Sequence, residues 1–486
     1  MNAVLTRTRN ARLYRRTVVS AILGCLFSAG ALAAQAGNDA ATLGRIRDSA
    51  MQSDWAYERL ADMTDLIGPR LSGSAGAAAA VEQVAAAMRK LGATVTLQPV
   101  KVPHWVRGAE TAELVEYAGR PAGLSQRVVL TALGGSGATP AAGLTAAVLV
   151  VRSFEELKAR AADVKGRIVL LDVPFDQQMA ERGLAGPAYG PGAQFRFGGP
   201  KAAAELGAVA ALVRSVGGAN YRIAHTGATG LSDDLRIPAA AVTVEDALLM
   251  GRLAARGPLQ MHLTLTPQNL PEVDSFNVIA DLPGSDKADE VVVVSGHLDS
   301  WDLATGANDD GAGVASAMAV LETLKKLKLQ PRRTIRMVAW MNEENGGRGG
   351  RAYFAANQHA LAKQFAAIES DSGAGRPFGI LASVGAPAEK LFAPLRQALQ
   401  PIGAHAFTRR DQLGTGDLHM LESGGVPSFE PLVDGHDYFH YHHTAADTLD
   451  KVAPDNLRRH AALMATLTWF LANMEQPIGR APAQDE

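Results

Sequence analysis

The sequence is poor in cysteine and carries almost no net charge. Its 486 residues include one cysteine, Cys25, which lies in an apolar segment near the N-terminus. The rest of the chain therefore has neither a disulfide nor a thiolate ligand. Lysines and arginines total 47 against 49 aspartates and glutamates, a net charge of −2, so no basic surface for nucleic acid is expected. Any metal site beyond the N-terminal segment must be built from histidines and carboxylates.

A hydrophobic run long enough for a comfortable membrane span is also lacking. The most apolar segment, residues 18–32, is shorter than the roughly 20 residues that a spanning helix needs. It follows several arginines and precedes small residues at 31–36, which is the pattern of a cleaved secretory signal. We predict a signal peptide over residues 1–36 and a secreted or periplasmic protein that has no membrane contact after cleavage. An uncleaved anchor and lipidation of Cys25 are the alternatives.

The length suits two or three domains, and the spacing of apolar residues separates them. From residue 270 onward, apolar runs such as Val291–Ser295 and Thr334–Met341 alternate with helical patterns such as Leu457–Met474. This alternation predicts an α/β fold, with a three-layer α/β/α domain and a mostly parallel central sheet. We assign residues 37–108 and 270–486 to this domain and expect ligands at the carboxyl ends of its strands.

The region between these two parts has a different character. Residues 109–269 contain short β-rich runs such as Ala147–Arg152 and Arg167–Val173. They also contain a glycine- and proline-rich stretch at Gly183–Gly199, which we expect to be a loop. We therefore predict a compact β-rich domain that is inserted into the larger one.

Acidic and imidazole side chains follow the predicted strands of the larger domain. His297 stands where the run Val291–Ser295 ends, and Asp299 is placed to orient the imidazole by accepting its other ring N–H. Asp309 and Asp310 open the next predicted helix in a glycine-rich turn, although a helix cap needs only one acid. The sequence therefore has one more acidic residue at this point than the start of a helix requires.

The later strands and the C-terminal part repeat this arrangement. Glu343 and Glu344 follow the next apolar strand, Asp371 follows the one after it, and His442 and His443 come near the C-terminus. Because the carboxyl ends of parallel strands share one edge of a sheet, we expect these side chains to converge.

Each of these residues also has an ordinary structural explanation. A single histidine at a strand end is more often hydrogen-bonded than metal-bound, paired acids can favour a helix N-terminus, and His442 and His443 can pack among aromatic rings. Together, however, converging acids and imidazoles would be costly to bury unless cations compensate them. Oxygen and imidazole ligands suit zinc, and also manganese or cobalt. Two such ions would need one bridging carboxylate, and an unligated carboxylate beside them would transfer protons.

Four segments resemble, in order and spacing, the M28 family of co-catalytic zinc exopeptidases: GHLDSWD at 296–302, NDDG at 308–311, EE at 343–344 and HTAADT at 443–448. These motifs are highly specific as a set. The likeness to one branch of the family extends over nearly the whole chain after the signal and includes segments 68–74, 102–105 and 274–277. In this comparison the inserted region resembles a protease-associated domain.

The resemblance implies two zinc ions per chain, held by five side chains: His297, Asp309, Glu344, Asp371 and His443. Asp309 would bridge the two ions. His297 and Asp371 would complete one site, and Glu344 and His443 would complete the other. We choose His443 over the adjacent His442 because the family pattern places the ligand directly before the threonine of HTAADT.

The resemblance also assigns roles to residues that bind no metal. Glu343 would be the general base and Asp299 would orient His297. The peptide bond between Asp309 and Asp310 would be cis, and the chain would form a homodimer. Because no expected ligand is missing, the pattern argues against a non-catalytic, receptor-like protein.

The sequence thus predicts a zinc exopeptidase that acts on short peptides, with dipeptides favoured. A broader aminopeptidase is the nearest rival, and a non-peptidase amidohydrolase with a mononuclear site is a more distant one. We expect Asp417 to line the substrate pocket and to meet a free amino terminus, although a plain loop turn explains its segment equally well.

Overall fold

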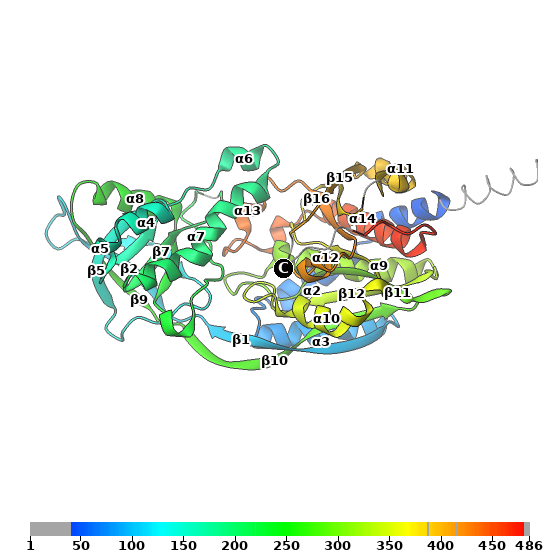
Figure 1. Ribbon diagram of the computed structural model, residues 1–486, viewed down its shortest axis with the longest axis horizontal. Helices are drawn as coiled ribbons and strands as arrows, with labels where there is room; N and C mark the ends of the chain where they lie inside the picture. Colours follow the sequence, from blue (N-terminus) through cyan, green and yellow to red (C-terminus); the bar gives the residue numbers. More distant parts are fainter. Residues whose placement is uncertain (1–39, 219, 386–387, 415, 481–486) are drawn as a thin grey trace, which may run out of the picture.

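The computed structural model describes residues 40–218, 220–385, 388–414 and 416–480. The predicted signal peptide and Cys25 lie outside these residues. Two lobes lie side by side in Figure 1, and each is built on a sheet of its own. We call residues 110–265 the second lobe and the remaining described residues the first lobe. No helix in the part of the chain that the structure describes is long and apolar enough to cross a membrane.

The first lobe contains a mixed sheet whose strands have the following order: β1 (Thr94–Val106), β10 (Gln268–Leu282), β12 (Arg333–Trp340), β11 (Lys287–His297), β13 (Gln364–Glu369), β16 (Ser428–Val433), β14 (Pro377–Ser383) and β15 (Ala406–Arg410). The central strands β12, β11, β13 and β16 are parallel. The pairs β1–β10, β10–β12 and β14–β16 are antiparallel. The predicted α/β fold class is confirmed, with the parallel pairs concentrated where the predicted site residues lie.

Helices cover both faces of this sheet: residues 40–51, α2 (Trp55–Leu66), α3 (Ala75–Lys90), α9 (Ala312–Lys326), α10 (Arg348–Asn357), α11 (Ala393–Leu399), α12 (His419–Ser423) and α14 (Pro454–Asn473). The short helix α13 (Tyr438–Tyr441) instead contacts a helix of the second lobe. Strand β11 shows why three layers form. Val292 and Val294 pack with α3, α9 and α14, whereas Val291 and Val293 pack with α10 and α12. Successive side chains of a strand point to opposite faces, so a continuous valine run suits a strand that is covered on both sides.

The second lobe contains the other sheet, with the strand order β3 (Gln126–Val128), β2 (Glu110–Tyr117), β9 (Leu259–Leu265), β5 (Leu144–Val151), β6 (Ile168–Leu171), β7 (Ala210–Arg214), β8 (Ala239–Val242) and β4 (Leu130–Ala132). Strands β5 to β8 are parallel. The helices of this lobe are α4 (Phe154–Ala159), α5 (Ala161–Val164), α6 (Gln177–Glu181), α7 (Ala185–Glu205) and α8 (Val244–Ala254). The likeness of this lobe to a protease-associated domain stays a prediction.

The glycine- and proline-rich stretch that we expected to be a loop at 183–199 is mostly helical, and this prediction was wrong. Helix α7 runs from Ala185 to Glu205 with two prolines inside it. Two of its glycines allow close packing, because a Cβ on Gly199 would lie 2.5 Å from Leu171 and one on Gly192 would lie 2.6 Å from Val216. Tertiary packing therefore outweighs the weak intrinsic preference of this composition for helix.

Candidate metal centre

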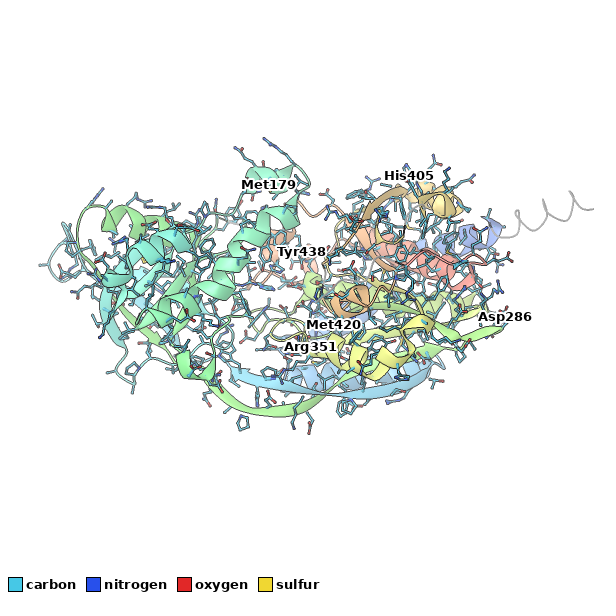
Figure 2. The ribbon with its side chains drawn as sticks, viewed as in Figure 1. Met179, Asp286, Arg351, His405, Met420 and Tyr438 are labelled. Carbon is cyan, nitrogen blue, oxygen red and sulfur yellow. The ribbon has the colours of Figure 1, made fainter. Side chains whose placement is uncertain are left out.

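The predicted site residues lie at the carboxyl edge of the three central strands of the first sheet. His297 ends β11, Glu344 follows β12, and Asp371 follows β13. Since β12, β11 and β13 are neighbours in this order, their ends bring the three side chains to one edge. His443 reaches the same place from the segment after α13, and Tyr438 on α13 lies between the two lobes (Figure 2).

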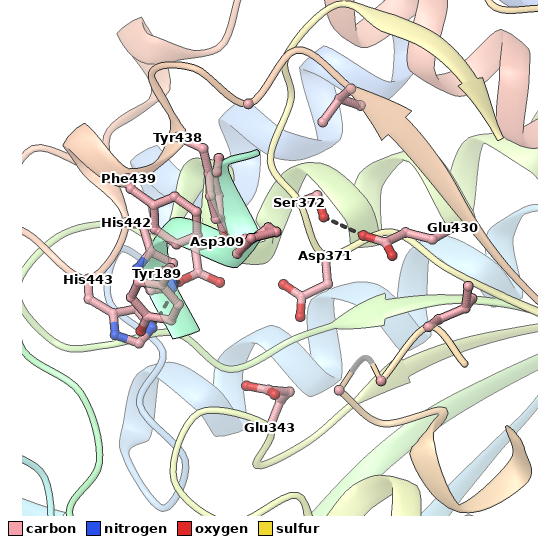
Figure 3. Close-up of a pocket in the computed structure, with 18 of the residues that line it drawn as sticks. Tyr189, Asp309, Glu343, Asp371, Ser372, Glu430, Tyr438, Phe439, His442 and His443 are labelled. Atoms are coloured by element: carbon pink, nitrogen blue, oxygen red, sulfur yellow. Dashed lines mark hydrogen bonds and ion pairs between the residues drawn. The ribbon is translucent and has the colours of Figure 1, made fainter. Parts of the chain in front are cut away.

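Asp309 occupies the centre of this group, with each carboxylate oxygen facing a different pair of side chains. Its Oδ1 lies 3.1 Å from His297 Nε2, which is 3.3 Å from Asp371 Oδ1. Its Oδ2 lies 3.2 Å from His443 Nε2, which is 3.0 Å from Glu344 Oε2. Figure 3 shows Asp309 between the histidine pair and Asp371. The five predicted ligands are therefore brought together as two sets that share Asp309.

The ring nitrogens of both histidines have defined roles. His297 Nδ1 lies 3.0 Å from the carbonyl oxygen of Asp299, and His443 Nδ1 lies 3.2 Å from the carbonyl oxygen of Thr226. Because a carbonyl oxygen only accepts hydrogen bonds, each Nδ1 must carry a proton and donate it. A neutral ring in this tautomer presents the lone pair of Nε2 to carboxylate oxygens, and the two repel each other unless a proton or a metal cation lies between them.

His442 lies close enough to compete with His443. Its Nε2 is 3.5 Å from Asp309 Oδ2, and its ring stacks on that of His443 with the centroids 3.6 Å apart. Asp309, His442 and His443 form one group of side chains whose ligand atoms could hold an ion. His443 alone of the two histidines also faces Glu344, among the contacts of the described residues.

Further acids, to which the sequence analysis gave no role, hold the central residues in place. Asp447 accepts hydrogen bonds from the backbone N–H groups of Asn308, at 2.8 Å, and Asp309, at 3.1 Å. Asp310 accepts one from the backbone N–H of His297, at 3.0 Å. The peptide bond between Asp309 and Asp310 is cis, as the resemblance implies. The two adjacent aspartates therefore have different roles. Asp309 faces the site, whereas Asp310 binds the backbone at the end of β11.

Asp299 contacts His297 through a different atom from the one that a carboxylate–histidine pair would use. The contact to Nδ1 is made by the Asp299 backbone carbonyl. The Asp299 carboxylate accepts hydrogen bonds from the backbone N–H groups of Asn342, at 2.7 Å, and Glu343, at 3.1 Å. Asp299 thus links the end of β11 to the loop that carries Glu343 and Glu344.

Glu343 borders a cavity of about 1000 Å³ that opens onto the grouped side chains. In Figure 3 the carboxylates of Glu343 and Asp371 both point into this space. Burial raises the pKa of Glu343 well above its usual range, and the carboxylates of Asp371 and Glu344 raise it further. A carboxyl group with a raised pKa beside a reaction space suits proton transfer near neutral pH.

Asp417 occupies a different place from the predicted one. Its side chain is only 3% exposed, and its Oδ1 accepts a hydrogen bond from the Gly350 N–H at 2.7 Å. The residues of this segment that line the cavity are Gly414 and Gly416. The structure therefore brings glycine backbone, rather than the Asp417 side chain, to the cavity wall.

The second lobe supplies cavity residues that the sequence analysis missed. Tyr189 and Arg196 on α7 line the cavity, and Arg196 Nη1 lies 3.4 Å from His443 Nδ1. Arg196 Nε is buried without a hydrogen-bond partner in the described part of the chain. A Cβ on Gly227 would lie 2.3 Å from this Nε, so Gly227 leaves room for the guanidinium. The only sequence signal was an arginine among aromatic residues in the stretch that we took for a loop.

The chemistry of the grouped side chains fits divalent cations. Two groups meet the spacing that a metal ion requires: Asp309 with His442 and His443, and His297 with Asp309 and Asp371. Asp309 Oδ2 and Glu344 Oε1 are buried and lack hydrogen-bond donors among the described residues. Buried carboxylate oxygens without donors are costly, and coordination to a cation removes that cost.

Comparisons with known proteins agree with this picture. Residues 277–468 match the model of peptidase family M28. The chain is 36% identical to carboxypeptidase Q of Bos taurus, over 88% of this chain and 87% of that protein. It is 23% identical to aminopeptidase YwaD of Bacillus subtilis, with the same shares covered. A solved structure of a peptidase M28 precursor from Shewanella amazonensis SB2B has 36% identity and a TM-score of 0.86, covering 92% of this chain and 100% of that one.

Together with the fold and the grouped acids and imidazoles, these matches define the class of the protein, which is a metallopeptidase. The chain belongs to peptidase family M28, as the four sequence motifs predicted. The branch of the family that it resembles along nearly its whole length is that of carboxypeptidase Q.

Proposed function

We propose that the protein is an exported di-zinc exopeptidase that hydrolyses dipeptides. The observation that carries this proposal is the position of Asp309, whose two oxygens each face a separate histidine–carboxylate pair. His297 and Asp371 would hold one zinc ion, and Glu344 and His443 the other. When bound, two zinc ions would lower the pKa of a water molecule and polarise the scissile carbonyl.

Glu343 would move the protons of the reaction. Its carboxylate reaches the cavity and is not part of either ligand pair. It would accept a proton from the attacking water and return it to the leaving amine, because a carboxyl group whose pKa is raised by burial can do both. The hydrogen bond from the Glu343 N–H to Asp299 fixes the backbone of this base relative to β11.

The walls of the cavity suit a substrate that has charges at both ends. Arg196 and Arg410 line it together with Glu343 and Glu430. Burial raises the pKa of Glu430 to about 7, and Ser372 donates a hydrogen bond to its carboxylate (Figure 3). No carboxylate of the described residues forms a salt bridge with Arg196, which leaves its charge for a substrate carboxylate. A zwitterionic dipeptide offers complementary groups of both signs.

A substrate panel tests this proposal. Free dipeptides should be cleaved, N-acetylated or C-amidated versions should be cleaved far more slowly, and a zinc chelator should abolish turnover that added zinc restores. Metal analysis should find two zinc ions per chain. Stepwise shortening of tetrapeptides from the amino end would overturn the dipeptidase proposal in favour of the second candidate.

That second candidate is a broader aminopeptidase. It is favoured by the similarity to an aminopeptidase over most of the chain and by the acidic groups Glu343, Asp371 and Glu430 on the cavity wall, which suit a substrate ammonium group. The same metal centre would serve either activity. The relative rates for dipeptides and for longer peptides with free amino ends separate the two.

Export and self-association complete the proposal. The arginine-rich and then apolar N-terminal segment supports export, and the N-terminal sequence of the mature protein would show whether cleavage follows the small residues at 31–36. A homodimer is proposed from the family resemblance alone, and sedimentation equilibrium of the purified protein would test it.

A further inference from the structure

We infer that the second lobe is a structural part of the metal centre, because three of its residues hold His443 in its ligating position. We call Gly218, His225 and Thr226 the bracket. This inference rests on the proposed function, since it assumes that His443 binds metal. It adds that one of the two metal sites depends on contacts between the lobes, whereas the other is complete within the first lobe.

The bracket binds the backbone of the segment that carries His443. The Thr226 N–H donates to the His443 carbonyl at 2.8 Å, and the Gly218 N–H donates to the Phe439 carbonyl at 3.0 Å. His225 Nδ1 lies 3.0 Å from the His442 carbonyl and must donate to it. Three hydrogen bonds from the second lobe thus reach the carbonyls of His442 and His443 and that of Phe439, earlier in the same segment.

The conformation of His443 shows why such contacts are needed. Its φ angle is +61°, in the left-handed region that side chains other than glycine rarely adopt. Such a conformation persists only where the surroundings fix it. At His443 the surroundings include Thr226, whose N–H binds the carbonyl of His443 and whose carbonyl accepts the proton of its Nδ1.

His297 and His443, the histidines of the two proposed zinc sites, therefore depend on different parts of the molecule. The acceptor for His297 Nδ1 is the Asp299 carbonyl, two residues away in the same lobe. The acceptor for His443 Nδ1 is the Thr226 carbonyl, from the other lobe. The partner of the second ring nitrogen sets the tautomer and orientation of a ligating histidine, so loss of the bracket should weaken only the His443 site.

The bracket is itself anchored within the second lobe. Thr226 Oγ1 donates to the Ala132 carbonyl at 2.9 Å, and the His225 N–H donates to Ser215 Oγ at 2.9 Å. Trp301, from the loop after β11, also packs into the core of the second lobe, where a Cβ on Gly134 would lie 2.2 Å from its ring. Contacts between the two lobes thus involve both the segment that carries His443 and the loop after β11.

The test is zinc binding to the purified full-length protein, followed by titration in a metal buffer. His225→Phe removes the donor to the His442 carbonyl. One of the two zinc sites should weaken by about 10- to 100-fold, the usual effect of losing a partner outside the ligand shell, while the other keeps its affinity. His225→Asn retains an N–H donor near the Nδ1 position and should restore most of the loss. His262→Phe, at a histidine on β9 in the same lobe, is the matched control and should leave both sites unchanged.

A second measurement does not depend on a variant that folds. Zinc should slow amide hydrogen exchange at Thr226 in the wild-type protein, because its N–H is bound to the residue that the metal fixes. If Thr226 exchange is indifferent to zinc, or if His225→Phe keeps both affinities, the bracket has no role in the metal centre even though the proposed function stands. If the wild-type protein binds fewer than two zinc ions, the proposed function fails first.

Discussion

The two lobes contain sheets of similar construction whose edges differ in one respect. In each, buried parallel strands end in charged residues. In the second lobe Asp172 follows β6, and Arg214 ends the neighbouring β7. The Nη1 atom of Arg214 lies 3.2 Å from Asp172 Oδ1. In the first lobe Asp309 and Glu344 have histidines, but no lysine or arginine, within ion-pair distance among the described residues.

This difference shows what separates a site from a structural ion pair. An acidic residue at the end of a strand does not by itself indicate a binding site, because a nearby arginine can compensate its charge. A set of buried acids that have only imidazoles beside them needs cations from outside the chain. The comparison therefore predicts opposite consequences for removing an acid from each edge.

The largest effect is expected for Asp309→Asn. The change removes the charge that both proposed zinc sites share, so both ions should be lost. Catalysis should fall by at least about 1000-fold, since the metals supply several kcal/mol of stabilisation to the transition state. Elemental analysis and dipeptide turnover measure the two losses. Asp172→Asn is the control from the other edge and should keep its zinc and its turnover, whereas two tightly bound ions in Asp309→Asn would remove the basis of the comparison.

Glu343→Gln should lower kcat by about 100- to 10,000-fold while both zinc ions stay bound. The amide has the shape of the carboxylate but cannot accept the proton. Steady-state kinetics on a dipeptide, together with zinc analysis of the same sample, test this expectation. A variant that binds two zinc ions and retains full activity would show that Glu343 is not the base.

Asp172→Ala should destabilise the protein without affecting the chemistry. It leaves the Arg214 guanidinium, whose side chain is 14% exposed, without its partner. Breaking such a pair costs about 3 kcal/mol of unfolding free energy. Urea denaturation measures this loss, and turnover per folded molecule should equal that of the wild-type protein. A large loss of turnover would mean that the second sheet edge also serves the reaction.

The smallest effect concerns His460, a buried histidine of the first lobe that is bonded to Ser370 Oγ at 2.8 Å. Burial lowers the pKa of His460 to about 4 from 6.5. Between these two values the unfolded state binds the extra proton, so His460 reduces stability as the pH falls below 6.5. The reduction is about 1 kcal/mol by pH 5.5. Urea denaturation of the metal-free protein at pH 7 and pH 5.5 tests this, because the change in stability between the two pH values should differ between His460→Gln and the wild-type protein by about 1 kcal/mol.

Local patterns in the sequence predicted the fold of the first lobe and the acids and imidazoles that gather at the edge of its sheet. The valine run of β11 and the acids after β12 and β13 are short-range signals, because a strand end and the residue that follows it are neighbours in the chain. The part of helix α7 before Pro200 was missed because two of its glycines pack against Leu171 and Val216, and composition does not reveal such contacts.

The second-lobe contacts to the site were missed for a related reason. Thr226 acts through backbone atoms, which any residue possesses, and it meets His443 only in the folded chain. Arg196 reaches the cavity because α7 is a helix that crosses toward the first lobe. No motif of one sequence encodes such contacts.

Strands β1 and β10 pair with each other along the first sheet's edge, from Thr94 opposite Asp281 to Val106 opposite Gln268. Every strand of the second sheet lies between them in the chain. During synthesis, therefore, all the strands of the second sheet are made before β1 can meet its partner. Because domains fold as units from the N-terminal side, the second lobe can be complete before the edge of the first sheet closes. The segment that carries His443, which is made after every strand of both sheets, would then dock against a bracket that is already in place.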